Sequence, residues 1–339
     1  MALSPQLHDA SQGRDDADVA ADARPPAAGG LAVQTRGLTK RYGSRAALDG
    51  VDLEVPRGCA FGFLGPNGAG KTTLIRLLLG LAEPTAGQMR LLGHELPGQA
   101  TVALARVGAI IEEPRFHPHL SGRENLAVHA AARERAAYGR IDGALARVGL
   151  GARADDRVKA YSLGMRQRLG IARCLLADPE LLVLDEPLNG LDPAGIGDMR
   201  RLIRELVDEG RTVLLSSHLL DEVQRTCDAA AIVDDGKVIA QGTIDDLTGG
   251  GPRAIDVDCD HSVRAGSLLA RLPGVARATR RDGGYRVELL PDAPADRAVV
   301  TELVRRLLSG GVAIERVSPV ATSLEQRFLT MTTRLEDRS

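Results

Sequence analysis

The sequence contains the stretch Gly65-Pro66-Asn67-Gly68-Ala69-Gly70-Lys71-Thr72-Thr73, which fits the pattern G-x-x-x-x-G-K-[ST]. An apolar run from Cys59 to Leu64 precedes it, and a run with helical character from Thr73 to Leu79 follows it. Between a strand and a helix, glycines let successive backbone N–H groups point at phosphate oxygens, and the helix start adds positive potential. We therefore predict that this stretch, called the phosphate loop below, binds a nucleoside triphosphate.

Two side chains at the end of the phosphate loop have expected roles of their own. Lys71 is expected to reach the β- and γ-phosphates, and the Thr72 hydroxyl is expected to bind Mg²⁺. A loop of this kind also needs an acidic site, because the metal ion and the attacking water must both be held.

The segment from Leu181 to Glu186 supplies that acidic site. Leu181 to Leu184 is a short apolar run, which favours a buried parallel strand. The strand brings Asp185 and Glu186 to its carboxyl end, where open α/β sheets bind ligands. We expect Asp185 to orient the Mg²⁺ shell and Glu186 to act as general base or to polarise the water.

The composition argues against several other classes of protein. Lys and Arg number 43 and Asp and Glu number 45, so the net charge of -2 gives no reason to bind nucleic acid or an acidic membrane surface. Aromatic residues are scarce and Trp is absent, so a stacking platform for nucleic acid is not expected. No apolar run approaches the roughly 18–20 residues that span a bilayer, and the N-terminus lacks the features of a secretory signal. Any membrane role is therefore expected to come through a partner chain.

The cysteines give no sign of a metal site or of a disulfide framework. They form no C-x-x-C pair and lie far apart, at Cys59, Cys174, Cys227 and Cys259. We therefore expect buried free thiols.

The chain divides into three regions. Residues 1–30 are polar and rich in Ala, Asp and Pro, so we expect a disordered tail. Residues 31–248 alternate between strand and helix patterns, as in a mainly parallel α/β domain, with a helical subdomain at about 115–165. Residues 249–335 begin with a Gly-Gly-Gly-Pro linker and follow the order β-α-β-β-α-β of a ferredoxin-like domain, without a catalytic constellation.

Local signals set several boundaries in the first domain. Leu31–Thr35 and Val51–Val55 alternate like half-exposed antiparallel strands, and a turn is expected at Leu48-Asp49-Gly50. Ser121-Gly122-Arg123-Glu124 is a capping box that starts a helix running toward Ala136. Asp192-Pro193 is an N-cap followed by proline at the first helical position.

These ordered motifs resemble the ATP-binding subunits of ABC transporters over residues 31 to about 247. The phosphate loop matches the family's form GPNGAGKTT letter for letter. Tyr42 stands where the family places an aromatic ring that stacks on adenine, and His218 matches the histidine that contacts the γ-phosphate. Asn189-Gly190-Leu191-Asp192 resembles the family's D-loop, so Asp192 is expected at the nucleotide. The resemblance implies an α/β P-loop NTPase core with an antiparallel β subdomain and a helical insert, beside the small α+β ferredoxin-like domain.

Two motifs depart from the family pattern. The signature stretch, usually L-S-G-G-Q, reads Tyr161-Ser162-Leu163-Gly164-Met165, and the resemblance implies that Ser162 and Gly164 contact ATP held by a second subunit. Glu112 replaces the glutamine of the Q-loop, and its carboxylate is expected at Mg²⁺ or its water. Both changes resemble the subgroup that exports bacitracin, daunorubicin and similar drugs. So does the end Ser323–Leu329, which fits S-L-E-x-x-F-L and opens an expected helix to Met331.

The resemblance implies that two ATPase subunits together form the working unit and that one chain is half of it. Two ATP molecules would join two subunits head to tail, and we expect a homodimer. Opening after hydrolysis would reach a separate polytopic membrane subunit through the loop from Glu112 to Phe116. We therefore expect a cytoplasmic ATPase, peripheral on the inner face of the cell membrane, that uses ATP and Mg²⁺ to power export of a drug-like or antibiotic molecule.

Two alternatives stay open. A soluble ABC-type ATPase could act on ribosomes or nucleic acid, although translation-associated members carry two phosphate loops and this chain carries one. A weakly hydrolysing regulatory subunit would fit Glu112 and Leu163. The residues that argue against it are Lys71, Asp185, Glu186 and His218, which are all present.

Overall fold

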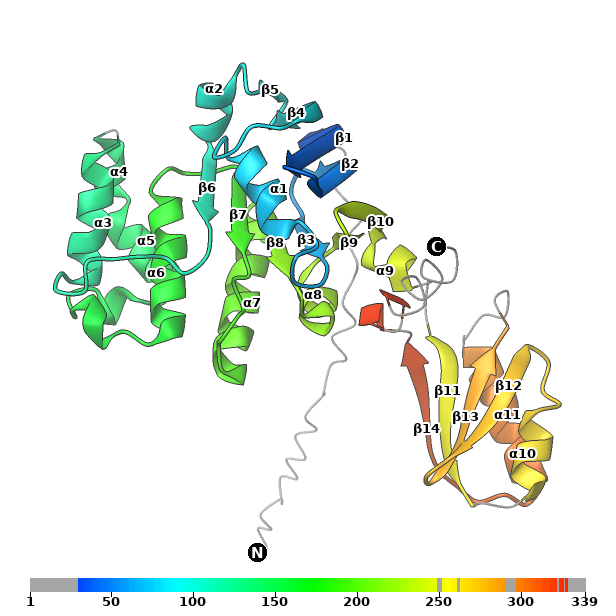
Figure 1. The fold of residues 1–339 in the computed structure, drawn as a ribbon. Coiled ribbons are helices and arrows are strands. Elements are labelled where there is room, and N and C mark those ends of the chain that lie inside the picture. Colours follow the sequence, from blue (N-terminus) through cyan, green and yellow to red (C-terminus); the bar gives the residue numbers. More distant parts are fainter. Residues whose placement is uncertain are drawn as a thin grey trace, which may run out of the picture.

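In the residues that it describes, the computed structural model contains three β-sheets with helices packed on them (Figure 1). It describes residues 30–133, 135–248, 252–260, 263–290, 297–321, 323–325 and 327–328. The expected disordered tail lies outside these residues apart from Gly30, and so do the linker glycines at 249–251. Residues 329–335 of the expected last domain, with the end of the helix expected to reach Met331, also lie outside them. None of the helices in the described ranges is long and apolar enough to cross a membrane.

A six-stranded sheet in the order β10-β9-β3-β8-β7-β6 forms the centre of the fold. Its strands are β3 (Ala60–Leu64), β6 (Val107–Ile110), β7 (Leu181–Asp185), β8 (Thr212–Ser217), β9 (Ala229–Asp234) and β10 (Lys237–Thr243). All pairs are parallel except β9 with β10. Every residue of β3, β7 and β8 is buried, which explains why β3 and β7 are apolar up to Asp185, whereas β8 also buries the hydroxyls of Thr212, Ser216 and Ser217. The predicted parallel α/β sheet is therefore confirmed.

Helices cover both faces of the central sheet. The helices are α1 (Lys71–Leu78), α6 (Leu163–Leu175), α7 (Pro193–Asp208), α8 (Leu220–Thr226) and α9 (Ile244–Thr248). Phe61 and Phe63 of β3 belong to the apolar cluster under α1, whereas Leu64 belongs to the cluster under α6, α7 and α8. The predicted start of α7 is confirmed, because the Asp192 carboxylate accepts the Gly195 N–H at 3.0 Å.

A four-stranded antiparallel sheet packs on the α1 side of the central sheet, in the order β2-β1-β4-β5. It consists of β1 (Leu31–Tyr42), β2 (Arg45–Pro56), β4 (Ala86–Leu91) and β5 (His94–Leu96), followed by α2 (Ala100–Leu104). The turn predicted at Leu48–Gly50 is wrong, since these residues lie within β2 and the hairpin turns at Gly43-Ser44. Gly50, with a φ of 66°, lies at an irregularity in the pairing of β1 with β2. Its N–H donates to Thr39 Oγ1 at 3.1 Å.

The helical insert precedes β7. It contains α3 (Gly122–Ala131), α4 (Ala136–Gly139), α5 (Ile141–Arg147), two short 3-10 helices at Gly151–Arg153 and Val158–Ala160, and α6. The predicted capping box is confirmed, because Ser121 Oγ accepts the Glu124 N–H at 3.1 Å and the Glu124 carboxylate accepts the Ser121 N–H at 2.7 Å. α3 ends at Ala131, before the expected Ala136.

Residues 252–321, called the C-terminal domain below, form an antiparallel sheet with two helices against one face (Figure 1). The elements are β11 (Pro252–Cys259), α10 (Val263–Leu269), β12 (Val275–Arg281), β13 (Gly284–Leu289), α11 (Arg297–Ser309) and β14 (Ile314–Ala321). Their sheet order, β12-β13-β11-β14, together with the order along the chain, confirms the predicted ferredoxin-like fold. Ile255 and Val257 are buried in this domain's own apolar cluster, so the domain has a core separate from those of the central sheet.

The four cysteines are all free and buried, as predicted. Burial raises the pKa of the Cys59 thiol to about 12 and that of the Cys174 thiol to about 11. Thiols with such pKa values are protonated at neutral pH, so these residues act as apolar packing groups.

A short segment after β14 returns to the central domain. Leu324 is fully buried in the apolar cluster under α6, α7 and α8, and Phe328 packs against the same cluster. The Leu324 N–H donates to Gln224 Oε1 of α8 at 3.0 Å, and Arg327 Nε donates to the Leu247 carbonyl at 3.1 Å. The C-terminal domain is therefore attached to the central domain at both of its ends.

Replacing Leu324 with Ala is expected to lower the free energy of unfolding by about 2–5 kcal/mol, the range for truncating a buried leucine. Leu308→Ala is the matched control, because Leu308 is 58% exposed on the C-terminal domain and exposed substitutions change stability by at most about 0.5 kcal/mol. Urea titrations followed by circular dichroism compare the two variants. Equal stability of the two would contradict the burial of Leu324 against the central domain.

Candidate functional site

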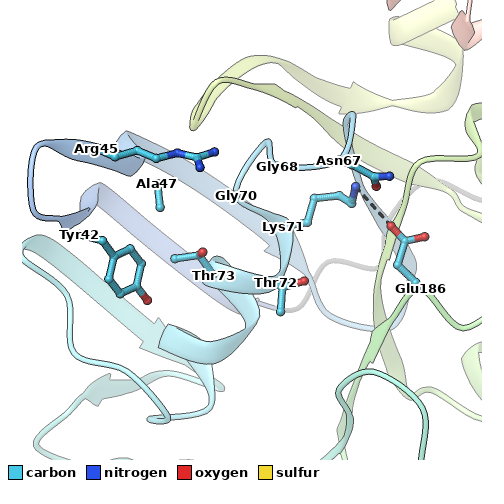
Figure 2. A pocket seen from close by; sticks show the side chains of 10 residues that line it. All are labelled: Tyr42, Arg45, Ala47, Asn67, Gly68, Gly70, Lys71, Thr72, Thr73 and Glu186. Carbon is cyan, nitrogen blue, oxygen red and sulfur yellow. Dashed lines mark ion pairs between the residues drawn. The ribbon is translucent and has the colours of Figure 1, made fainter.

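A cavity of about 450 Å³ opens beside the phosphate loop, where β3 and β7 end (Figure 2). It is lined by Tyr42, Arg45, Ala47, Asn67, Gly68, Gly70, Lys71, Thr72, Thr73 and Glu186. All of these except Arg45 and Ala47 were predicted from the sequence. The structure therefore brings together a loop, a strand end and a hairpin that are far apart in the chain.

The glycines of the phosphate loop are required by its backbone path. Gly68 and Gly70 have φ values of 87° and 104°, which favour glycine. A Cβ added at Gly70 would lie 2.4 Å from the Ala47 carbonyl oxygen, and one added at Gly65 would lie 2.2 Å from the Val233 carbonyl oxygen. Neither position can therefore accept a side chain, as expected for a loop whose backbone cradles phosphate.

Lys71 is the first residue of α1, and its side chain is only 6% exposed. Its Nζ donates to the carbonyl oxygens of Gly65 at 2.8 Å and Pro66 at 3.2 Å, and it lies 3.2 Å from Glu186 Oε1 (Figure 2). The Ala69 N–H donates to the same Pro66 oxygen at 3.2 Å. These oxygens compensate the burial of the ammonium charge and hold it at the phosphate loop.

Asp185 is buried at the end of β7, and both of its carboxylate oxygens are engaged. One accepts the Thr72 hydroxyl at 3.0 Å and the other accepts the Ser216 hydroxyl at 2.5 Å. Thr72 and Asp185 thus place two hard oxygen atoms side by side, which is the donor type that Mg²⁺ requires. Within the described residues, no group of three or more His, Cys, Asp or Glu side chains could hold a metal ion. The Thr72–Asp185 pair fits a Mg²⁺ ion that takes its other ligands from phosphate and water.

Glu186 lies between Lys71 and His218. Its Oε1 is 3.2 Å from Lys71 Nζ, and its Oε2 is 2.8 Å from His218 Nδ1. Its φ of 49° is unusual for a residue other than glycine. The side chain is 23% exposed, so water can reach the carboxylate. The three side chains predicted to act on the γ-phosphate therefore form one contact group.

The β1–β2 hairpin forms the other end of the cavity (Figure 2). Tyr42 is 53% exposed, and Lys40 Nζ lies 5.0 Å from the centroid of its ring. Arg45 pairs directly with Tyr42 across the hairpin, and its Nη2 is 3.6 Å from the position of a Cβ added at Gly68. Among the described residues the guanidinium has no salt-bridge partner. Arg45 and Ala47 were not predicted from the sequence, because their places at the cavity depend on how β1 and β2 pair across this hairpin.

Three further predicted ligands, Ser162, Gly164 and Asp192, lie outside the cavity. Ser162 and Asp192 each cap their own helix, α6 and α7, by accepting a backbone N–H at 3.3 Å and 3.0 Å. A Cβ added at Gly164 would lie 3.6 Å from Leu191 Cδ2, so the signature stretch and the D-loop are neighbours. The structure places the three residues together, but not at this chain's own phosphate loop.

Glu112, a predicted metal ligand, also lies outside the cavity and has a φ of 59° and a 65% exposed side chain. Its carboxylate pairs with Arg76 of α1 at 3.0 Å. The next residue, Glu113, pairs with Arg166 of α6 at 3.1 Å. The loop after β6 is therefore joined by ion pairs to the helix after the phosphate loop and to the helix that Ser162 caps.

Asn125 fixes the backbone between His117 and Ser121, which follows the loop that carries Glu112. It was not predicted from the sequence. It is 1% exposed on α3, and its amide group donates to the carbonyl oxygens of His117 at 3.0 Å and Ser121 at 2.8 Å. The amide oxygen accepts the His117 N–H at 2.8 Å. A polar side chain on the inward face of an otherwise Ala- and Leu-lined helix is the signal that could have identified it.

Comparison with known proteins identifies the family. Residues 48–189 match the family described as ABC transporter. A daunorubicin resistance ATP-binding protein of Streptomyces coeruleorubidus is 40% identical over 311 residues, which cover 89% of this chain and 96% of that protein. A bacitracin transport ATP-binding protein of Bacillus licheniformis is 46% identical over 216 residues, covering 63% of this chain and 71% of that protein. A solved ATP-binding subunit of an ABC transporter is 32% identical, with a TM-score of 0.57 over 64% of this chain and 91% of that chain. The predicted resemblance is confirmed, and this chain belongs to the family of ATP-binding, ATP-hydrolysing subunits of ABC transporters.

Proposed function

We propose that this chain powers the export of a drug-like or antibiotic molecule through a separate polytopic membrane subunit. The observation that carries this proposal is the similarity to the daunorubicin resistance protein over 96% of its length, which extends beyond the ATPase domain into the C-terminal domain. The bacitracin transport relative supports the same class of substrate. Binding to the membrane subunit would place this chain on the inner face of the cell membrane.

Each part of ATP has a proposed place in or beside the cavity. Its volume of about 450 Å³ lies in the usual range for a small-molecule site. The ring of Tyr42 offers a face for adenine, and the phosphate loop with Lys71 holds the phosphates. Thr72 and Asp185 would hold Mg²⁺, which would neutralise charge on the phosphate oxygens.

Glu186 is the proposed general base. It accepts a proton from water while the water oxygen bonds to the γ-phosphorus and the bond from that phosphorus to the ADP oxygen breaks, which yields ADP and phosphate. His218 is proposed to orient Glu186 through the 2.8 Å contact and to contact the γ-phosphate when ATP is bound. Lys71 supplies positive charge to the transferred group.

The remaining contacts to ATP are proposed to come from a second copy of this chain. Ser162, Gly164 and Asp192 lie together but outside the chain's own cavity. A head-to-tail pair would bring them to the ATP on the partner's phosphate loop, and two identical copies make this contact isologous. The two nucleotides would then hold the dimer closed until hydrolysis.

Glu186→Gln is expected to lower kcat at least about 100-fold, because the amide keeps the shape of the side chain but cannot accept a proton. ATP binding and ATP-dependent dimerisation should remain. Phosphate release and size-exclusion chromatography measure the two effects, with Glu54→Gln on the exposed face of β2 as control. Near-normal turnover of Glu186→Gln would remove Glu186 from the catalytic role.

Arg45→Ala is expected to weaken ATP binding about tenfold, the value of one charge-assisted hydrogen bond to phosphate. Adenosine, which has no phosphate, should bind both proteins equally. Arg41→Ala is the matched control, because Arg41 is exposed on the same hairpin and does not line the cavity. Isothermal titration calorimetry measures the affinities for ATP and adenosine. An equal loss of affinity for both ligands would argue against a contact between Arg45 and phosphate.

Coupling to a membrane subunit predicts that the tagged chain, purified from detergent-solubilised membranes of its own cells, brings a polytopic protein with it. The Glu186→Gln variant with ATP should retain this partner best, because the closed dimer persists. Recovery of ribosomes without a polytopic protein would favour the soluble ABC-type ATPase. A recovered complex without ATPase activity would favour the weakly hydrolysing regulatory subunit.

A further inference from the structure

Ser216 makes two contacts that link the two acidic residues of the site. It lies on β8 with no exposed surface, directly opposite Asp185 in the parallel pairing of β7 and β8. Its hydroxyl donates to Asp185 Oδ1 at 2.5 Å and accepts the Glu186 N–H at 2.9 Å. One side chain therefore contacts the carboxylate of the first acidic residue and the backbone of the second.

A hydroxyl suits this place because of its hydrogen-bonding capacity. It offers one donor and two acceptor lone pairs, so it can serve a carboxylate and an N–H group at once. The other oxygen of Asp185 accepts the Thr72 hydroxyl at 3.0 Å. Hydroxyls on both sides thus fix the plane of the Asp185 carboxylate.

The contact with Glu186 supports an unfavourable backbone conformation. Glu186 has a φ of 49°, in a region that residues with a side chain rarely adopt. Such conformations persist only where the surroundings hold them in place. The bond from the Glu186 N–H to Ser216 holds this peptide, and the side chain then reaches Lys71 and His218.

We propose that Ser216 is a positioning residue that sets the orientation of both the metal-binding carboxylate of Asp185 and the general base Glu186. The proposal rests on the roles assigned to these two residues under the proposed function. Ser216 itself touches neither nucleotide nor water in this scheme, since it does not line the cavity. Its loss should therefore affect metal affinity and turnover but not the binding of nucleotide without metal.

The test compares Ser216→Ala with Thr35→Val. Thr35 is a matched control, because its buried hydroxyl also donates one hydrogen bond, to the Val51 carbonyl at 2.8 Å, and accepts one, from the Leu53 N–H at 3.0 Å, far from the site. For Ser216→Ala we expect at least a tenfold lower kcat and a several-fold higher Mg²⁺ concentration for half-maximal rate. Calorimetry should show unchanged ADP affinity without Mg²⁺ and a smaller gain in affinity when Mg²⁺ is added. Thr35→Val should resemble the wild type in all of these measurements.

A second pair of variants covers the case in which Ser216→Ala does not fold. Ser216→Thr and Ser216→Val have the same shape and differ only by a hydroxyl in place of a methyl group, so the threonine variant should turn over at least tenfold faster. Equal turnover of this pair, or an unchanged kcat and Mg²⁺ dependence of Ser216→Ala, would overturn the proposal. A normal rate for Glu186→Gln would instead refute the catalytic role of Glu186, and the calorimetric Mg²⁺ comparison would still test Ser216.

Discussion

The pairing of the parallel strands β3, β8 and β7 is the constraint on which the site depends. Leu64 lies opposite Ser217, and Asp185 lies opposite Ser216, so the phosphate loop, the two carboxylates and His218 leave the sheet at the same edge. A shift of one residue in β7 would exchange the two faces of the strand and turn Asp185 away from the phosphate loop. Such a shift is opposed because it would separate the buried Asp185 carboxylate from the Thr72 and Ser216 hydroxyls that donate to it.

The sheet edge also contains features that cost stability. Lys71 is nearly buried, Asp185 and Glu186 are adjacent in the chain, and Glu186 has a positive φ, which costs roughly 1–3 kcal/mol in general. Each feature is compensated by a neighbour that serves the site as well: Glu186 pairs with Lys71, and the Ser216 hydroxyl holds the Glu186 peptide. Unfavourable groups held by their surroundings are typical of sites arranged before the ligand arrives.

Features that depend on a few consecutive residues could be predicted from the sequence, whereas features that depend on strand pairing could not. The phosphate loop, the β7 strand end and the caps at Ser121 and Asp192 were predicted correctly, since each depends on a few consecutive residues. The turn at Leu48–Gly50 was wrong because a glycine at a strand irregularity has the same local pattern as a glycine in a turn. Ser216 was missed because its role comes from the register of two strands 31 residues apart in the chain.

The last described segment, residues 323–325 and 327–328, joins the C-terminal domain to α8, beside the sheet edge that carries the site. β11 follows α9 across the linker, and beyond β14 the chain returns so that Leu324 is buried and bonded to Gln224 on α8. That helix begins two residues after His218, and its Val223 fills the space next to Gly62 of β3, where a Cβ would lie 2.4 Å from Val223 Cγ1. Because a close-packed contact of this kind leaves little room for independent movement, a displacement of the segment would also displace α8 and β3, the strand that leads into the phosphate loop. The segment that follows the C-terminal domain is thus bonded to α8, the helix that begins two residues after His218, so the domain is tied to a helix that lies next to the site.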